Sequence, residues 1–213
     1  MREGADATRW SLLVAAAELF DAHGYTGTSI SAVSRRCGLT SGAVYFHYAN
    51  KQSLARAVIE EHFASWPALI RRAAHSPAGC VLDRIVNLSY EVAAAFRDDI
   101  VVRAGGRLWL ERRTINVALP PPFSGWIETL TGLLDAARAD GSVAAHVDPR
   151  AAAGVLVCAF FGTHTVSDAL DERQHIERHL TDLWLHLLPG LAPDPHVTAA
   201  EMLGRARAYV DVR

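Results

Sequence analysis

Two histidines spaced four residues apart come nearest to the pattern of a catalytic site in this chain. His175 and His179 would lie on one face of a helix, as paired histidines do in zinc proteases. Glu177, however, does not stand where the zinc-protease motif places its general base, and no third ligand is evident in the sequence. Because the two histidines flank the apolar positions Ile176 and Leu180, we expect a solvated or interface role, with no metal site and no cofactor.

Other kinds of enzyme chemistry also lack a motif. Serine, histidine and aspartate are scattered without the spacing of a nucleophile motif, and the chain has no glycine-rich phosphate loop. Cys37, Cys80 and Cys158 are odd in number, lack paired spacing and have apolar or small neighbours, which is typical of buried thiols. The sequence therefore predicts a protein that is not an enzyme. Stoichiometric zinc in the purified protein would reverse that prediction.

A short polar and aromatic segment, residues 40–48, has side chains that suit the major groove of DNA. Thr40 can cap a short helix, and the residues after it leave small, polar and aromatic groups free to face base edges. In the preceding helix Val33 and Cys37 would point inward, and Gly38 permits the tight turn of a helix-turn-helix. The alternative is an ordinary helical hairpin whose aromatic residues belong to the core.

The elements that must position this segment are helices. Apolar residues recur at helical spacing almost throughout and no stretch alternates with period 2, so the chain should be all-α. A first helix should stop at Gly24-Tyr25, helices should begin near Thr28 or Ser29, Thr40 and Asn50, and Pro67 should kink or end the fourth. Further helices are expected over about 81–96, 100–113, 123–138, 149–169, 172–188 and 198–210, and Asp148-Pro149 is the start signal of the helix from residue 149.

Two of these helices have unusual compositions. Gly105 and Gly106 cost roughly 1 kcal/mol each relative to alanine inside a helix, which indicates a close helix crossing or the approach of a ligand. The helix over 149–169 is apolar nearly all round, which predicts burial on more than one face.

Charge and composition point to a soluble protein with a slightly basic N-terminal part. The formal net charge is -2, so electrostatics alone would not coat nucleic acid, although the first sixty residues sum to +1 and the rest to -3. Apolar stretches such as 151–161 are too short to span a membrane, and the first residues do not resemble a secretion signal. We therefore expect a cytoplasmic protein that has no membrane partner.

Residues 8–54 resemble the DNA-binding head of the TetR family of repressors. The resemblance rests on Ala16-Ala17, Leu19-Phe20, Gly24-Tyr25, Thr28, Ile30, Val33, Cys37-Gly38, the run Gly42-Ala43-Val44-Tyr45-Phe46-His47-Tyr48, Lys51 and Leu54. It implies a three-helix head over residues 1–52, followed by a larger ligand-binding and dimerisation domain over 53–213. It also implies phosphate contacts for Tyr45 and Lys51. The residues that it places at or near DNA are Thr28, Thr40, Ser41, Gly42, Val44, Tyr45, His47 and Lys51.

The rest of the chain resembles one branch of that family, the γ-butyrolactone receptors and related autoregulator receptors of actinobacteria. The residues that carry this resemblance are Val102 to Leu108, Pro122-Phe123, Trp126, Val157-Cys158 and Gly162-Thr163. In that branch the position of Ser41 is commonly lysine, so DNA affinity or operator preference should differ here.

The resemblance implies an apolar ligand pocket with a few polar groups. Trp126 would line the pocket, and Thr163 would offer a hydroxyl to a lactone or another ligand oxygen. Further candidates for the walls are Tyr90, Trp109, Leu130, Phe160 and Phe63. Ordinary core packing is the alternative for each of these residues.

Two copies of the last long helices could form a four-helix dimer interface. The expected interface residues are Leu156, Phe160, Ile176, Leu180, Leu183, Trp184 and Leu187. The sequence thus predicts a homodimeric repressor on a pseudo-palindromic operator, with recognition helices about 34–36 Å apart. A small-molecule effector would release it through a shift of the fourth helix. The effector could be a butyrolactone, a butenolide, a furan or an antibiotic, and a helical adaptor that binds only protein is the alternative that a gel shift would exclude.

Overall fold

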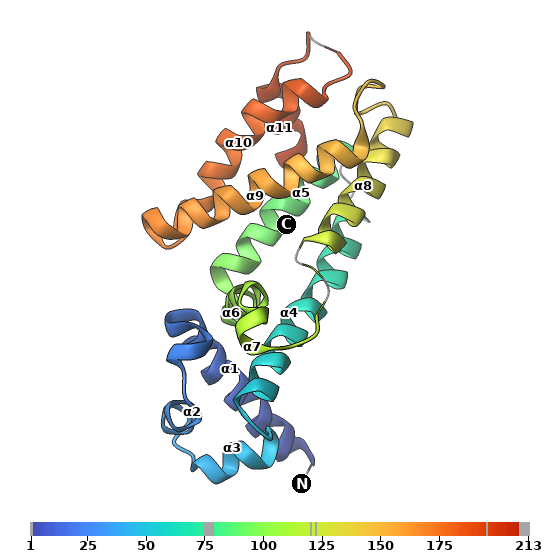
Figure 1. Ribbon diagram of the computed structural model, residues 1–213. Helices are drawn as coiled ribbons and strands as arrows, with labels where there is room; N and C mark the ends of the chain where they lie inside the picture. Colours follow the sequence, from blue (N-terminus) through green and yellow to red (C-terminus); the bar gives the residue numbers. More distant parts are fainter. Residues whose placement is uncertain (1, 75–78, 120, 122, 195, 209–213) are drawn as a thin grey trace. The chain divides into compact units, whose positions relative to one another are not determined.

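The computed structural model describes residues 2–74, 79–119, 121, 123–194 and 196–208. Within these ranges the chain forms eleven α-helices and no strand, which confirms the all-α prediction. Figure 1 labels the helices: α1 (Arg2–Gly27), α2 (Ile30–Arg36), α3 (Ser41–His47), α4 (Lys51–Ala74), α5 (Val81–Asp98), α6 (Ile100–Leu110), α7 (Arg112–Ile115), α8 (Ser124–Ala139), α9 (Pro149–Asp171), α10 (Ile176–Leu191) and α11 (Ala199–Arg207).

The helices fall into two compact units. The N-terminal unit comprises the chain up to Pro67 together with the segment that begins at Asp98 and contains α6 and α7. The C-terminal unit comprises the stretch from Ala68 to Arg97 and the chain from Phe123 through α11. The unit that holds the first three helices is therefore larger than residues 1–52, and a functional boundary at residue 52 stays a prediction.

Local sequence signals explain the start of the N-terminal unit. The side chains of Ser29 and Thr40 accept hydrogen bonds from backbone N–H groups of the first turns of α2 and α3, as N-caps do. Gly24 has φ 68° and ψ -179°, so it interrupts α1 at the predicted stop, and one more turn follows to Gly27. Val33 and Val44 are fully buried and hold α2 and α3 against the core of this unit.

Gly105 marks a close crossing of α6 with α4. A Cβ on Gly105 would lie 2.3 Å from Cβ of His62, closer than packed carbons approach. His62 is buried, and its Nδ1 lies 2.8 Å from the carbonyl oxygen of Val102. Of the two predicted reasons for the glycines, the structure shows the helix crossing. Pro67 does not end α4, which continues to Ala74.

The C-terminal unit has its own core, built from α5, α8, α9, α10 and α11. Asp148 caps α9 and Pro149 follows in its first turn, as predicted. The helix expected from residue 172 begins at Ile176, because Glu172 and Arg173 are left-handed, with φ 53° and 66°. Three contacts bind α11 to α5: Arg205 to Asp83, the backbone carbonyl of Ala206 to Asn87, and Arg207 over the ring of Tyr90.

One face of α9 is exposed in the single chain, so one copy alone does not provide the predicted burial on more than one face. By length and composition α9 would suffice to cross a membrane, and 28% of its most apolar window is buried. Cys158 is exposed on this helix, while Cys37 and Cys80 are half-buried, so the expectation of three buried thiols is wrong for Cys158. The exposed apolar and small residues form one stripe: Ala151, Val155, Cys158, Gly162, Val166, Ala169 and Leu170.

Candidate nucleic-acid interface and ligand pocket

The outer face of α3 presents aromatic side chains to solvent. Tyr45 is 53% exposed and Phe46 is 83% exposed, and the ring of Phe46 meets that of His47 edge-on at 5.1 Å between centroids. Thr40 and Gly42 are exposed at the start of the same helix. Ser41 is half-buried, and its hydroxyl lies 3.3 Å from that of Ser34 in the angle between α2 and α3. The helix therefore carries an accessible row of polar and aromatic groups.

Two of the residues expected at DNA point inward. Val44 is fully buried, so it supports α3 from inside and cannot present its side chain to a groove. Thr28 is 3% exposed, and its hydroxyl lies 3.0 and 2.9 Å from the carbonyl oxygens of Leu19 and Gly24. The expectation that these two side chains lie at the DNA surface is therefore corrected: both point into the head and support its fold. Phe46, which was absent from the expected contacts, is the most exposed aromatic side chain on the helix.

Lys51 joins the start of α4 to the α1–α2 connection. Its ammonium donates to the carbonyl oxygens of Tyr25 and Thr28 at 2.9 and 3.0 Å and lies 4.2 Å from the centre of the Tyr25 ring. An ammonium carries three N–H donors, so two such bonds leave one for a further acceptor. Lys51 is thus a half-buried cation with a fixed position.

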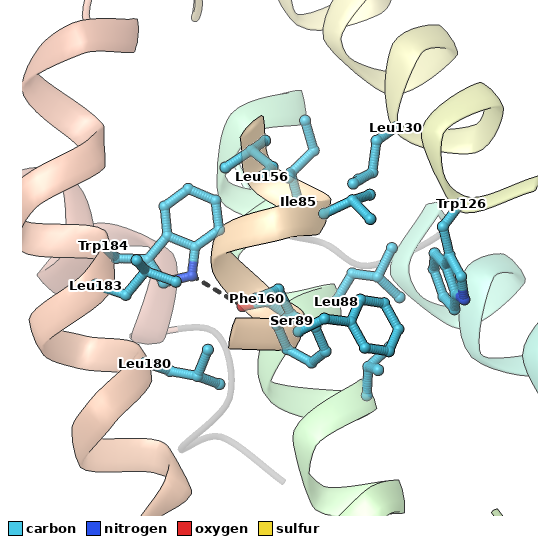
Figure 2. A pocket seen from close by; sticks show the side chains of 13 residues that line it. Ile85, Leu88, Ser89, Trp126, Leu130, Leu156, Phe160, Leu180, Leu183 and Trp184 are labelled. Carbon is cyan, nitrogen blue, oxygen red and sulfur yellow. Dashed lines mark hydrogen bonds between the residues drawn. The ribbon is translucent and has the colours of Figure 1, made fainter. Parts of the chain in front are cut away.

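The C-terminal unit contains a narrow apolar cavity, in which about 50 Å³ can be occupied by the centres of water-sized molecules. Figure 2 shows side chains from α5, α8, α9 and α10 around it. The lining residues are Ile85, Leu88, Ser89, Val92, Trp126, Leu130, Leu156, Val157, Phe160, Phe161, Leu180, Leu183 and Trp184.

The polar groups in this wall are few. Trp184 Nε1 donates to Ser89 Oγ at 2.9 Å, drawn as the dashed line in Figure 2. Ser89 Oγ in turn donates to the carbonyl oxygen of Val86 at 2.6 Å. A hydroxyl oxygen has two lone pairs, so Ser89 can accept one more hydrogen bond. The cavity therefore suits a mainly apolar molecule that carries a donor.

Three of the seven predicted ligand-binding residues meet at this cavity, namely Trp126, Leu130 and Phe160. Thr163 does not: it lines a separate surface depression between α9 and α10, with Val166 among its neighbours. Thr163 was expected in the pocket from the family resemblance, but its neighbours in this depression also include His179, Asp182 and His186 of α10. The structure therefore does not place the Thr163 hydroxyl in the cavity.

The other three predicted ligand-binding residues pack elsewhere. Tyr90 lies under Arg207, and its hydroxyl is 2.9 Å from Oγ1 of Thr181. Phe63 and Trp109 belong to the N-terminal unit, where their rings meet edge-on at 4.8 Å between centroids. These three side chains do not line the cavity, and a ligand-binding role for them stays a prediction.

The expected dimer residues lie in the core, at the cavity wall and in an outward depression. Ile176, Leu180, Trp184 and Leu156 are between 0% and 7% exposed, so their side chains cannot form an outer surface, and that part of the prediction is wrong. Leu187 is half-buried and lines an outward depression on α9 and α10. Leu183 and Phe160 are half-buried and line the cavity. Leu183 and Leu187 widen the apolar face of α10 beyond its buried residues, and periodicity alone cannot distinguish contacts with the core from contacts with a partner.

The histidines that resembled a metal site make a different contact. His175 Nδ1 lies 2.8 Å from Asp171 Oδ2, and His179 Nε2 lies 3.9 Å from the same oxygen. Among the residues that the structure describes, no group of three histidine, cysteine or acidic side chains is arranged to hold a metal ion.

Comparisons with known proteins agree with this two-part arrangement. Residues 12–58 match the family "Bacterial regulatory proteins, tetR family", and residues 80–193 match "Tetracyclin repressor-like, C-terminal domain". The A-factor receptor protein of Streptomyces griseus is 31% identical over 182 residues, which are 85% of this chain and 63% of that protein. The chain thus spans less than two thirds of that relative's length.

Two solved structures are similar over nearly the whole chain. A γ-butyrolactone receptor described as ArpA-like has a TM-score of 0.82 at 30% identity, with 100% of both chains covered. The TetR family protein CprB from Streptomyces coelicolor, in complex with its operator sequence, has a TM-score of 0.77 at 29% identity over 97% of this chain and 98% of that one. From its sequence and its fold, this chain belongs to the TetR family of bacterial regulatory proteins.

Proposed function

We propose that this protein is a cytoplasmic transcriptional repressor that binds a pseudo-palindromic DNA operator as a homodimer and leaves it when a small apolar effector binds. The observation that carries the proposal is the exposed face of α3, where Tyr45 and Phe46 stand outward on a helix whose inward residue Val44 is fully buried. A short helix with such a face suits the major groove. The similarity to CprB, whose structure includes its operator, supports the same assignment.

Phosphate contacts would set the register of α3 on the duplex. The hydroxyl of Tyr45 and the remaining N–H donor of Lys51 are good partners for phosphate oxygens. Two copies related by a two-fold axis would present their α3 helices about 34–36 Å apart, one turn of the duplex. The exposed apolar stripe of α9 gives a second copy a surface to cover.

The effector is proposed to be a γ-butyrolactone or a related amphipathic molecule. The relatives named as A-factor receptor and γ-butyrolactone receptor support this class, and the apolar walls of the cavity suit the apolar part of such a molecule. Effector binding and operator binding would weaken each other by the same factor, because both bias one conformational equilibrium. In this proposal the effector favours a state in which the two heads no longer match the groove spacing.

The function can be tested on operators that the wild-type protein selects from random duplexes. Tyr45→Ala should lose at least tenfold in operator affinity, and Tyr45→Phe should lose less, because only the phosphate hydrogen bond is removed. Trp126→Ala should bind the operator as the wild type does but resist release by a synthetic γ-butyrolactone with an alkyl chain. Fluorescence anisotropy of a labelled duplex measures both effects.

Arg138→Ala is the matched control, because it removes an exposed charge in the C-terminal unit. It should change neither affinity nor release. If the wild type enriches no duplex, or if Tyr45→Ala binds as tightly as the wild type, the assigned DNA surface is wrong. If the lactone never displaces the wild type, that effector class is wrong.

A further inference from the structure

We infer that α6 and α7 form a clamp on the DNA-reading head, with Glu111 and Gln52 as positioning residues that set α1, α2 and Lys51 in place for the operator. The inference rests on the proposed function and adds a requirement to it. The head does not hold its DNA-binding geometry by its first three helices alone. It depends on a segment that lies about fifty residues further along the chain, within the same compact unit.

The first contact of the clamp lies where α1 is interrupted. Gly24 has a positive φ of 68°, which breaks the helix there. The next backbone N–H, that of Tyr25, donates to Glu111 Oε2 at 2.8 Å. A carboxylate that accepts from a backbone N–H makes a charge-assisted bond, stronger than one between neutral groups. Glu111 thus fixes the chain where α1 loses its regular pattern.

A charged face of α6 reinforces this contact. Arg103, Arg107 and Glu111 are spaced four residues apart, so they share one side of the helix. Arg103 Nε lies 3.1 Å from Asp21 Oδ2, with side chains only 20% and 24% exposed. Arg107 donates to the carbonyl oxygen of Asp21 and pairs with Glu111 Oε1 at 3.2 Å. The Arg103–Asp21 pair is partly buried and is therefore screened less by solvent than an ordinary surface pair, whereas Arg107 is exposed.

The second contact of the clamp lies at the start of α4. Gln52 Nε2 donates to the carbonyl oxygens of Ile115 and Asn116, each at 2.9 Å. These carbonyls stand at the end of α7, where Asn116 is left-handed with φ 58°. Carbonyls at the end of a helix have no partner within it, so the Gln52 amide supplies one.

The two contacts of the clamp are linked at Tyr25. Its N–H binds Glu111, while its carbonyl oxygen accepts from the ammonium of Lys51, the neighbour of Gln52. Lys51 also holds the carbonyl oxygen of Thr28, just before α2. The clamp therefore fixes both the cation proposed to bind phosphate and the connection that leads to α2 and α3. The chain enters α6 directly from the cavity-lining helix α5, with Asp99 capping the new helix.

The test uses the full-length protein and the operator that the wild type selects. Glu111→Ala and Gln52→Ala should each weaken operator binding about tenfold, the effect expected for losing a hydrogen bond of this kind. Glu111→Gln should restore most of the affinity, because its amide oxygen can still accept from the Tyr25 N–H. Arg56→Ala breaks an exposed ion pair on α4 and should leave the affinity unchanged.

Hydrogen exchange provides a readout that does not depend on DNA. The Tyr25 amide should exchange faster in Glu111→Ala than in the wild type and at the wild-type rate in Arg56→Ala. If Glu111→Ala fails to fold, Glu111→Asp replaces it, since the shorter side chain withdraws the carboxylate and keeps the charge. It should weaken operator binding in the same direction.

The outcomes separate this inference from the proposed function. Wild-type affinity in both Glu111→Ala and Gln52→Ala, while the Tyr25 amide exchanges faster, would overturn the positioning role. Equal losses in Glu111→Ala and Glu111→Gln would also overturn it, because the accepted hydrogen bond would then be irrelevant. A wild-type protein that enriches no duplex would instead refute the DNA-binding proposal itself.

Discussion

Phe46 is 83% exposed, more than any other large apolar side chain that the structure describes. A phenyl ring left in water forgoes the free energy that burial of apolar surface provides. In the proposed complex the 5-methyl group of a thymine is the apolar feature of the major groove that such a ring can contact. Phe46 would then read sequence, while Tyr45 and Lys51 would bind phosphates.

We predict that the contact of Phe46 is with one thymine in each half-site. Replacing that thymine by deoxyuridine removes only the methyl group and should weaken wild-type binding roughly threefold to fivefold, as burial of one methyl group implies. Phe46→Ala should bind the operator less tightly and should not distinguish thymine from deoxyuridine. Anisotropy titrations over duplexes substituted at single positions measure the difference.

Tyr45→Phe is the control, because it retains Phe46 and should still respond to the deoxyuridine substitution. Equal wild-type affinity for every substituted duplex would show that Phe46 does not contact a thymine methyl group.

At the scale of helices, the caps could be predicted from short-range signals in the sequence, whereas the direction in which each side chain points could not. The caps Ser29, Thr40 and Asp148 follow from residue type and neighbours, and the structure shows each accepting a backbone hydrogen bond. Thr28 and Val44 stand at motif positions near the DNA-reading face, but a motif position does not say which way a side chain points. That depends on how the helices pack: the Thr28 hydroxyl binds backbone carbonyls of α1, and Val44 packs in the core that α1 and α4 share.

Only part of the cavity wall could be predicted from the sequence, for a similar reason. Trp126, Leu130 and Phe160 line it, whereas Phe63 and Trp109 are equally apolar and pack in the other unit. Ser89, the polar group in the wall, has no sequence signal of its own. It becomes recognisable only once Trp184 Nε1 is seen to donate to it across 95 residues of chain.

The crossing of α4 and α6 makes stability depend on pH. Burial lowers the pKa of His62 from its ordinary 6.5 to about 4, against a smaller opposing effect of the hydrogen bond to Val102. Between these pH values the unfolded chain binds a proton at this site and the folded chain does not. The contribution of a neutral His62 to the free energy of unfolding is therefore fully present above pH 6.5. As the pH falls towards 4, the free energy of unfolding decreases by roughly 3 kcal/mol.

His62→Asn should abolish this part of the pH dependence while keeping a donor near the position of Nδ1. Urea unfolding at several pH values between 4.5 and 7.5 measures the free energy of unfolding of both proteins. The wild type should lose more stability on acidification than the variant does, and the other histidines cancel in the difference. Equal losses would show that His62 takes up its proton without unfolding the crossing.

At the scale of the whole molecule, α9 explains why a single copy is incomplete. Its inward residues Leu156 and Val157 line the cavity, while Val155 and Val166 are 56% and 54% exposed on the outer stripe. A helix with apolar residues on two faces needs two partners, and one chain supplies only one. The sequence predicted burial of more than one face of α9 but assigned core residues, such as Leu156 on α9 and Leu180 on α10, to the dimer.

We therefore predict that the outer stripe, and not the inner residues, holds the dimer together. Val155→Glu and Val166→Glu should each raise the dimer dissociation constant at least a hundredfold, because dimer formation would bury an unpaired carboxylate in an apolar contact. Sedimentation equilibrium measures the change. Val197→Glu, which also replaces a partly exposed valine, lies outside the stripe and should remain a dimer. Monomeric variants should retain helical content by circular dichroism and lose operator binding, since one copy reaches one half-site. Dimers of unchanged stability in both stripe variants would mean that a second copy docks on another surface.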